Sequence, residues 1–360
     1  MYIDIFKPDF FDDDIRCDKS ILDNLFGHRM NYAAKGRHSI YHILKSSDRR
    51  GKVAMPVYAC SSIVDAVKKS GREIVFCDID ESDLNISVES LESIVGGIQF
   101  AIIPSLYGNP ADLDRIEKLC KANDVFMIDD AAQSFGARIN DRLVGTFGNA
   151  GLISFSPGKP LTGSMGSFFW EETDTYHITY KRPSKILHNI AFWDFYYNRY
   201  HIYEYKKYKV LHLFSLLNRL LQKRIDISED GMASFEKKHI LSSLTAFNEG
   251  KLSYKQNFVS LFSHLFGETE CFRIVKCQRG VSSNHKIVLV FNTKERTSSF
   301  RDYMRQMGIY TSGGYKILDS KNSNNYKNAR NLQGRIVELP VENSSVKMDY
   351  LFEKVNAFIK

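Results

Sequence analysis

Short, fully apolar runs alternate with helix-like segments between about residues 36 and 170. Residues 100–104 and 125–128 hold no polar side chain. Between these two runs, one helix face is expected at Leu113, Ile116, Leu119 and Cys120. Further strands are predicted over 53–58 and 74–78, and helices over 61–70, 87–95 and 113–123. Because continuously apolar strands are buried on both faces, the alternation predicts a parallel sheet covered by helices, which is an α/β fold.

The pattern changes after about residue 173. Residues 173–227 are rich in Tyr, Phe, Lys and Arg, and they predict helices with aromatic and basic faces. Such helices pack against the main domain or a second subunit, or they make weak peripheral contact with an anionic membrane. The pattern by itself leaves both interpretations open.

Helices and strands mix in the last third of the chain. A long helical pattern begins near residue 234, and the later elements are a strand over 286–291, a helix over 298–307, a strand over 336–339 and a helix over 348–359. The polar stretch 320–331 is expected to be a solvated loop. We therefore expect a large domain over residues 1–230, which includes the segment 173–227, and a small α+β domain over residues 231–360.

Composition excludes several classes of protein. The net charge of +7 is mild for 360 residues, and no nucleic-acid-binding module is recognisable, so no nucleic-acid partner is expected. The six cysteines are scattered, which argues against a metal site and a disulfide framework and favours reduced thiols in the cytoplasm. The acidic N-terminus lacks an apolar core, and no run of 18 apolar residues occurs, so neither a signal peptide nor a transmembrane helix is expected.

Residues 127–166 hold the candidate chemistry. Asp129 and Asp130 follow an apolar strand, where α/β sheets bind ligands, although they could equally cap the next turn. Lys159 stands in a stiff Pro-Gly-Lys-Pro turn after another strand, and Ser154 lies just before it. A carboxylate for the pyridine nitrogen, an amine for a Schiff base and a hydroxyl for the phosphate are what a pyridoxal phosphate (PLP) site requires. Most lysines, however, are solvated charges, and a serine at a strand end often bonds its own backbone.

Three stretches carry a resemblance to a known family. They read PVYACSSIVDAVKKSGREIVFCDID, IIPSLYGNPADLDRIEKLCKANDVFMIDDAAQSFGA and RLVGTFGNAGLISFSPGK. Together, residues 36–166 resemble the DegT/DnrJ/EryC1/StrS family of PLP-dependent sugar aminotransferases, and NARNLQGRIVELPV near the C-terminus resembles it more weakly. The resemblance implies the fold-type I aminotransferase architecture, with a large domain built on a mainly parallel mixed sheet and a small C-terminal α+β domain.

The resemblance also implies roles for individual residues. Lys159 would form the Schiff base with PLP and later move a proton between the substrate and the cofactor. Asp130 would pair with the protonated pyridine nitrogen, which keeps the ring electron-poor. Gln133 would bond near the ring oxygen, Ala132 would lie beside the ring, and Ser154 would bind the phosphate.

The chain departs from the family pattern around the cofactor. Lys35-Gly36-Arg37 stands where the family usually has Ser-Gly-Thr, so the N–H groups at Gly36 and the charge of Arg37 are expected to contact the phosphate. The family often stacks an aromatic ring or a histidine on the cofactor, and here either Tyr58 or Cys60 would lie at that position. Residues 163–166 differ from the usual Gly-Glu-Gly-Gly, and the asparagine that a partner subunit usually contributes has no clear counterpart near residues 229–232.

The resemblance implies an aminotransferase that passes an amino group, with glutamate as the expected donor, to a nucleotide-linked keto sugar for a bacterial surface polysaccharide. A sugar dehydratase of the same fold would be expected to carry histidine in place of Lys159. A PLP-binding sensor or scaffold without turnover is the alternative from another class. Enzymes of this fold generally form homodimers, and loop 310–315 together with the partner chain is expected to wall the sugar pocket.

Overall fold

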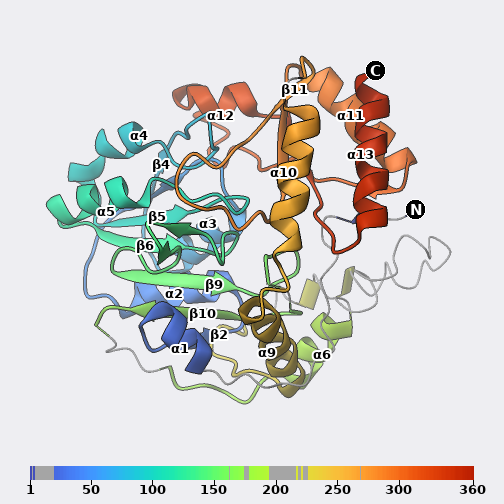
Figure 1. Ribbon diagram of the computed structural model, residues 1–360. Coiled ribbons are helices and arrows are strands. Elements are labelled where there is room, and N and C mark those ends of the chain that lie inside the picture. The colour runs from blue at the N-terminus through green and yellow to red at the C-terminus, as the bar shows by residue number, and fades with distance from the viewer. Residues whose placement is uncertain are drawn as a thin grey trace.

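The computed structural model describes residues 1, 3–4, 20–161, 163–173, 178–193, 216–217, 220–221, 226–267 and 269–360 (Figure 1). Much of the aromatic and basic segment 173–227 lies outside these residues, and so does the part of it on which the membrane interpretation depends. No helix in the described parts of the chain combines the length and the apolar character that crossing a membrane requires.

A mixed sheet of seven strands forms the centre of the described structure. In spatial order the strands are β2 (Asn31–Ala33), β10 (Ser167–Glu171), β9 (Ala150–Ser154), β6 (Phe126–Asp130), β5 (Phe100–Pro104), β3 (Val53–Pro56) and β4 (Ile74–Cys77). The neighbours from β9 to β4 are parallel, whereas β10 runs antiparallel to both β9 and β2. The predicted α/β class with a mainly parallel mixed sheet is therefore confirmed.

Helices cover both faces of this sheet, because its strands are apolar on both faces. One hydrophobic cluster packs the sheet against α2 (Gly36–Ser46) and α3 (Ser61–Lys69). A second cluster packs the other face against α1 (Ser20–Phe26), α4 (Val88–Glu92), α5 (Leu113–Ala122) and α9 (Ser234–Asn248). A short hairpin of β7 (Arg138–Ile139) and β8 (Arg142–Leu143) also contributes to the second cluster.

The C-terminal part has its own sheet and its own core. The antiparallel strands β11 (Phe272–Ile274), β12 (Ile287–Phe291) and β14 (Ile336–Leu339) pack against α10 (Tyr254–Phe266), α11 (Lys294–Gln306) and α13 (Ser345–Ile359). These three helices lie at the upper right of Figure 1. The short strand β13 (Ile309–Tyr310) contacts α11 and pairs with β1 (Ile3–Asp4). The domain boundary after residue 230 stays a prediction, and Ile240 and Leu244 of α9 beyond it pack in the cluster of the central sheet.

The predicted solvated loop over 320–331 is wrong in its second half. A short 3-10 turn at Ser323–Asn325 is followed by α12 (Lys327–Leu332), whose Ala329 and Leu332 are buried. The carboxylate of Asp78 accepts hydrogen bonds from the backbone N–H groups of Asn328 and Ala329, at 2.8 and 2.9 Å, and so satisfies the start of the helix. This acceptor lies 250 residues earlier in the chain, so the local pattern of 320–331 could not reveal it.

A buried histidine joins α6 (Lys185–Trp193) to α9. Nδ1 of His188 lies 2.6 Å from Oε1 of Glu236, and Nε2 lies 3.2 Å from Oδ2 of Asp230. The second carboxylate oxygen of Glu236 accepts from the hydroxyl of Tyr32 on β2. Because ionised carboxylates only accept, both ring nitrogens donate, and the imidazole is the charged form. Burial alone would lower the pKa of His188, but the hydrogen bonds and charges of Glu236 and Asp230 raise it above its usual value.

A histidine whose pKa is raised on folding stabilises the protein fully below pH 6.5, and this contribution is lost as the pH rises through the folded-state pKa. The free energy of unfolding, measured by urea denaturation, should therefore fall as the pH rises above 6.5. In His188→Gln this pH dependence should flatten, at an overall loss of about 3–5 kcal/mol because two buried carboxylates lose their partner. The exposed His264→Gln should keep the slope, and an equal slope in His188→Gln would contradict this account.

Candidate active site

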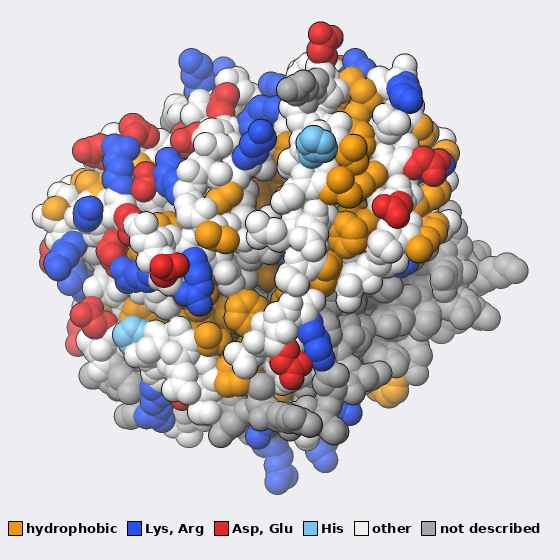
Figure 2. All heavy atoms as spheres, viewed as in Figure 1, with side chains coloured by type: hydrophobic (Ala, Val, Ile, Leu, Met, Phe, Trp, Pro, Cys, Tyr) orange, Lys and Arg blue, Asp and Glu red, His pale blue; other side chains and the backbone are white. Residues whose placement is uncertain are grey.

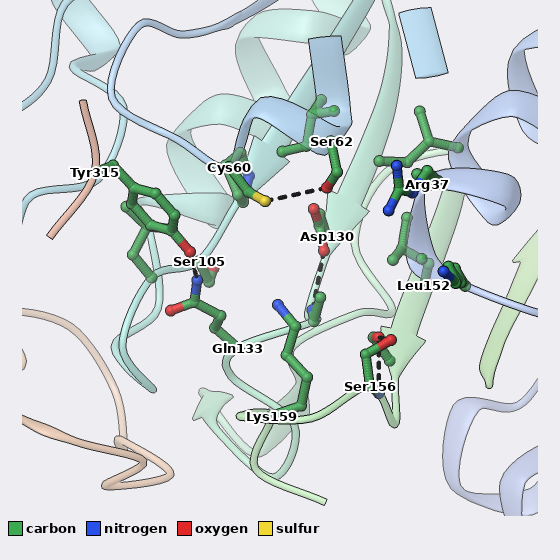
Figure 3. A pocket seen from close by; sticks show the side chains of 18 residues that line it. Arg37, Cys60, Ser62, Ser105, Asp130, Gln133, Leu152, Ser156, Lys159 and Tyr315 are labelled. Carbon is green, nitrogen blue, oxygen red and sulfur yellow. Dashed lines mark hydrogen bonds between the residues drawn. The ribbon is translucent and has the colours of Figure 1, made fainter. Parts of the chain in front are cut away.

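A cavity of about 230 Å³ opens where β3, β5, β6 and β9 end. In parallel sheets this edge is where ligands bind. The cavity also reaches the start of α2 and the loop after β13 (Figure 3). It brings together eight candidate residues of the sequence analysis, namely Gly36, Arg37, Cys60, Asp130, Ala132, Gln133, Ser154 and Lys159, whereas Asp129 and Tyr58 do not line it.

The paired aspartates at the end of β6 have different surroundings. Asp130 lines the cavity, whereas the side chain of Asp129 points to the other face because side chains alternate along a strand. Oδ2 of Asp129 accepts from the N–H groups of Gly145 and Phe147, at 2.5 and 3.1 Å. Asp129 therefore holds the turn at residues 145–147 and not the turn that follows it, whereas Asp130 faces the cavity.

The amine of Lys159 points into the cavity toward the carboxylate of Asp130 (Figure 3). Burial lowers the pKa of Lys159, and the negative charge of Asp130 opposes this effect. Burial raises the pKa of Asp130, and the charge of Lys159 opposes that effect in turn. The backbone N–H of Ala132 donates to Oδ1 of Asp130 at 2.9 Å and fixes the orientation of the carboxylate. Burial thus favours the neutral, nucleophilic form of the amine and the protonated form of the carboxyl, and the attraction between the two charges opposes both effects.

The start of α2 forms one end of the cavity. Its N-cap residue Lys35 makes no capping hydrogen bond with its side chain, so the first N–H groups of the helix are open to an anion. A Cβ built on Gly36 would lie 3.6 Å from Cβ of Ser154, so glycine leaves room beside that hydroxyl. Ser156 lies next to it, with the two side-chain oxygens 3.3 Å apart. N–H groups, hydroxyls and the guanidinium of Arg37 together make this end suited to a phosphate.

Gln133 and Tyr315 form the opposite wall of the cavity, and Tyr107 and Tyr58 are hydrogen-bonded behind them. The amide of Gln133 donates to the hydroxyl of Tyr315, and its oxygen accepts from the N–H of Tyr107 at 3.1 Å. The hydroxyls of Tyr107 and Tyr58 lie 2.6 Å apart. Tyr58 is buried behind this wall, whereas Cys60 lines the cavity with its sulfur 3.1 Å from the hydroxyl of Ser62. Of the two residues that the sequence left open, Cys60 is therefore the one that borders the cavity.

Five polar or charged lining residues are absent from the sequence-based candidates for cofactor binding: Lys35, Ser62, Ser105, Ser156 and Tyr315. Ser105 follows β5 directly, so its place at a strand end is the signal that could have found it. Tyr315 was expected only as part of the wall 310–315, and nothing in the local pattern connects it with Gln133. Burial and the charge of Arg37 lower the pKa of Lys35 to about 7, which makes it the second unusual amine of the cavity.

The fold is that of the PLP-dependent aminotransferases, and a lysine and an aspartate lie together at the carboxyl edge of its central sheet. Residues 30–179 match the DegT/DnrJ/EryC1/StrS aminotransferase family. The resemblance inferred from the sequence is therefore confirmed for this segment, which is less than half of the chain.

Individual relatives share part of the chain only. The GDP-4-keto-6-deoxy-D-mannose 3-dehydratase of Yersinia pseudotuberculosis is 32% identical over 143 residues, which are 39% of this chain and 36% of that protein. The UDP-N-acetyl-3-dehydro-alpha-D-glucosamine 3-aminotransferase of Acidithiobacillus ferrooxidans is 36% identical over 116 residues, which are 32% of this chain and 31% of that protein. The matches thus span about a third of the length of these relatives.

The fold of the whole chain is similar to that of solved structures. The E. coli GDP-4-keto-6-deoxy-D-mannose-3-dehydratase with bound hydrated PLP superposes with a TM-score of 0.70, covers 100% of both chains and is 16% identical. At that identity the likeness shows the fold alone.

Proposed function

We propose that this chain is a PLP-dependent aminotransferase that transfers an amino group, with glutamate as the donor, to a nucleotide-linked keto sugar for surface polysaccharide synthesis. The observation that carries the proposal is the amine of Lys159 facing the carboxylate of Asp130 in a cavity whose far end is suited to a phosphate. Relatives over the matched segment include a nucleotide-sugar 3-aminotransferase, which supports the substrate class.

The donors around the cavity fit PLP in number and in kind. Ser154, Arg37 and the N–H groups at Gly36 would hold the phosphate, Asp130 would hold the proton on the pyridine nitrogen, and Gln133 would reach the ring oxygen. Cys60 and Ala132, which both line the cavity, would contact the ring. When bound, PLP supplies an electron-accepting ring that stabilises negative charge at the reacting carbon.

The protein's own groups then have two tasks. Lys159 would bind the cofactor covalently and, once the substrate amine has displaced it, would move the proton at the substrate carbon. A lysine whose pKa is lowered by burial gives up its own proton more readily, so that the neutral amine can act as the base. Asp130 would keep its proton shared with the ring nitrogen through both halves of the reaction.

Two other functions compete with this proposal. A sugar dehydratase of this fold is expected to carry histidine at the position of Lys159, so the lysine argues against it, although dehydratases are among the relatives. A PLP-binding sensor would use the same cavity without turnover, and the Lys35-Gly36-Arg37 departure is the feature that favours it. Only turnover separates the sensor from the enzyme.

The test uses the PLP-loaded protein and glutamate in the absence of a sugar. We expect one equivalent of 2-oxoglutarate and conversion of the cofactor to its amine form. A panel of nucleotide-linked 3-keto and 4-keto sugars is then added, and the sugar that is the substrate should restore PLP. Lys159→Ala should slow 2-oxoglutarate formation about a thousandfold or more because it removes both the nucleophile and the base. Lys118→Ala, on the exposed side of α5, is the matched control. Tight PLP binding without conversion by any amino donor would favour the sensor.

We also propose a homodimer in the cytoplasm, with the sites at the subunit interface. Large apolar side chains on the surface support self-association: Figure 2 shows apolar groups over α10 and α13, where Leu261, Leu265 and Val346 are exposed. Ile186 and Trp193 of α6 are exposed as well. The five cysteines in the described residues are free thiols, which supports a reducing compartment.

Multi-angle light scattering tests the assembly. The full chain should elute with twice the mass of 41.4 kDa over the micromolar range, with and without PLP. A monomer at these concentrations would contradict the dimer, and it would require one chain alone to complete the site.

A further inference from the structure

The peptide groups on both sides of Lys159 are held by buried side chains from the C-terminal part of the chain. Nε2 of His285 lies 3.0 Å from the carbonyl oxygen of Gly158, and Nζ of Lys255 lies 3.4 Å from the carbonyl oxygen of Pro160. Both side chains are buried, at 8% and 5% exposure. Neither residue lines the cavity, so they contact the turn that carries the lysine and not a ligand.

The loop of His285 is itself fixed against the central sheet. Gly108 follows β5 with φ +96°, and its carbonyl oxygen accepts from the N–H of Ser283 at 2.9 Å. A Cβ on Gly108 would lie 2.8 Å from the backbone nitrogen of His285, so only glycine allows this close approach. The imidazole is therefore attached to the sheet at one side and to the Lys159 turn at the other.

The hydrogen bond also sets the charge state of His285. A carbonyl oxygen only accepts, so Nε2 carries the proton. Nδ1 is buried and has no hydrogen-bond partner among the described residues, which leaves it unprotonated. Burial, together with the charges of Lys286 and Lys255, lowers the pKa of His285 well below its usual value. The neutral ring thus adds no positive charge beside Lys159.

The next residue brings a charge pair to the same place. Lys286, directly before β12, forms a buried ion pair with Glu338 of β14. The charge of Lys286 lowers the pKa of Lys159, and that of Glu338 raises it. The charged or titratable groups with the largest effects on the pKa of Lys159 are Asp130 and Cys60 at the edge of the large sheet, and Lys286 and Glu338 from the C-terminal part.

We propose that His285 and Lys255 are positioning residues that hold the turn of Lys159 from both sides, so that its amine faces Asp130 and stays out of bulk water. The C-terminal part of the chain thereby controls the geometry of a residue that belongs to the large sheet. The inference rests on the proposed function only for its cofactor readout, because the contacts exist in the protein without a ligand.

His285→Leu is the sharpest variant, because the ring is neutral and leucine removes the hydrogen bond without removing a charge. His285→Gln keeps a donor and is the conservative variant. His264→Leu, at an exposed position of α10, is the matched control. Lys255→Met removes the hydrogen bond to the carbonyl oxygen of Pro160, and it is the variant to use if His285→Leu does not fold.

Two ligands separate positioning of Lys159 from general damage to the cavity. PLP reacts with the lysine, whereas 4-deoxypyridoxine 5′-phosphate has no aldehyde and occupies the same cavity without that bond. We expect His285→Leu to slow covalent attachment of PLP about tenfold, the size of one lost hydrogen bond, and to change the affinity for the deoxy analogue less than twofold. His285→Gln should recover most of the rate. An equal loss for both ligands, or no loss for either, would overturn the proposal.

A second readout needs no cofactor. Competitive acetylation of the ligand-free protein, followed by peptide mapping, reports the pH at which Lys159 becomes reactive. In His285→Leu the amine gains access to water, so its half-maximal reactivity should move upward toward that of Lys118, which itself should not move. An unchanged profile would overturn the proposal. If the wild type never attaches PLP, the proposed function fails, and this profile still decides the positioning role.

Discussion

The amine of Lys159 and the carboxylate of Asp130 face each other inside one cavity, and burial works against the charge of both. Neither group could hold an ordinary charge there without the other, since an isolated buried ion is costly. Their mutual attraction compensates for part of that cost, and a bound pyridine ring would change it by sharing a proton with the acid. The chemistry proposed for this chain depends on this pair.

The architecture explains why the pair forms. β6 and β9 are parallel neighbours, so Asp130 at the end of one strand and the turn after the other meet at the same edge of the sheet. Strand alternation sends Asp129 to the other face, where it fixes residues 145–147, while Asp130 stays in the cavity. The start of α2 and Ser154 add the polar end. His285 and Lys255 of the C-terminal part are hydrogen-bonded to the backbone on both sides of Lys159.

The sequence was sufficient where the information is local. The apolar runs that became β5 and β6 are buried at every position of β5 and nearly every position of β6, so their pattern alone predicted them. Asp130 and Lys159 follow the neighbouring parallel strands β6 and β9, and the structure brings both side chains to one cavity, as the family resemblance implied. Helix α11 begins at Lys294, four residues before the prediction, because the hydroxyl of Thr293 accepts from the N–H of Arg296 and caps it.

Contacts between distant segments were not predictable from the sequence. Asp78 caps the start of α12, Tyr315 is hydrogen-bonded to Gln133, which lies 182 residues away, and His285 is hydrogen-bonded to Gly158, which lies 127 residues away. None of these pairs follows from periodicity or spacing, because each depends on how the C-terminal part packs on the central sheet. Lys35 is a similar case: its sequence position marks a helix start, and only the fold shows that its pKa is lowered to about 7 beside the cavity.

The most direct measurement is the reduction of the PLP-loaded full chain with borohydride, followed by peptide mapping of the modified lysine. The account predicts one modified peptide, with the cofactor attached at Lys159. Attachment at Lys35, the other lysine that lines the cavity, or at a lysine elsewhere in the chain would contradict it.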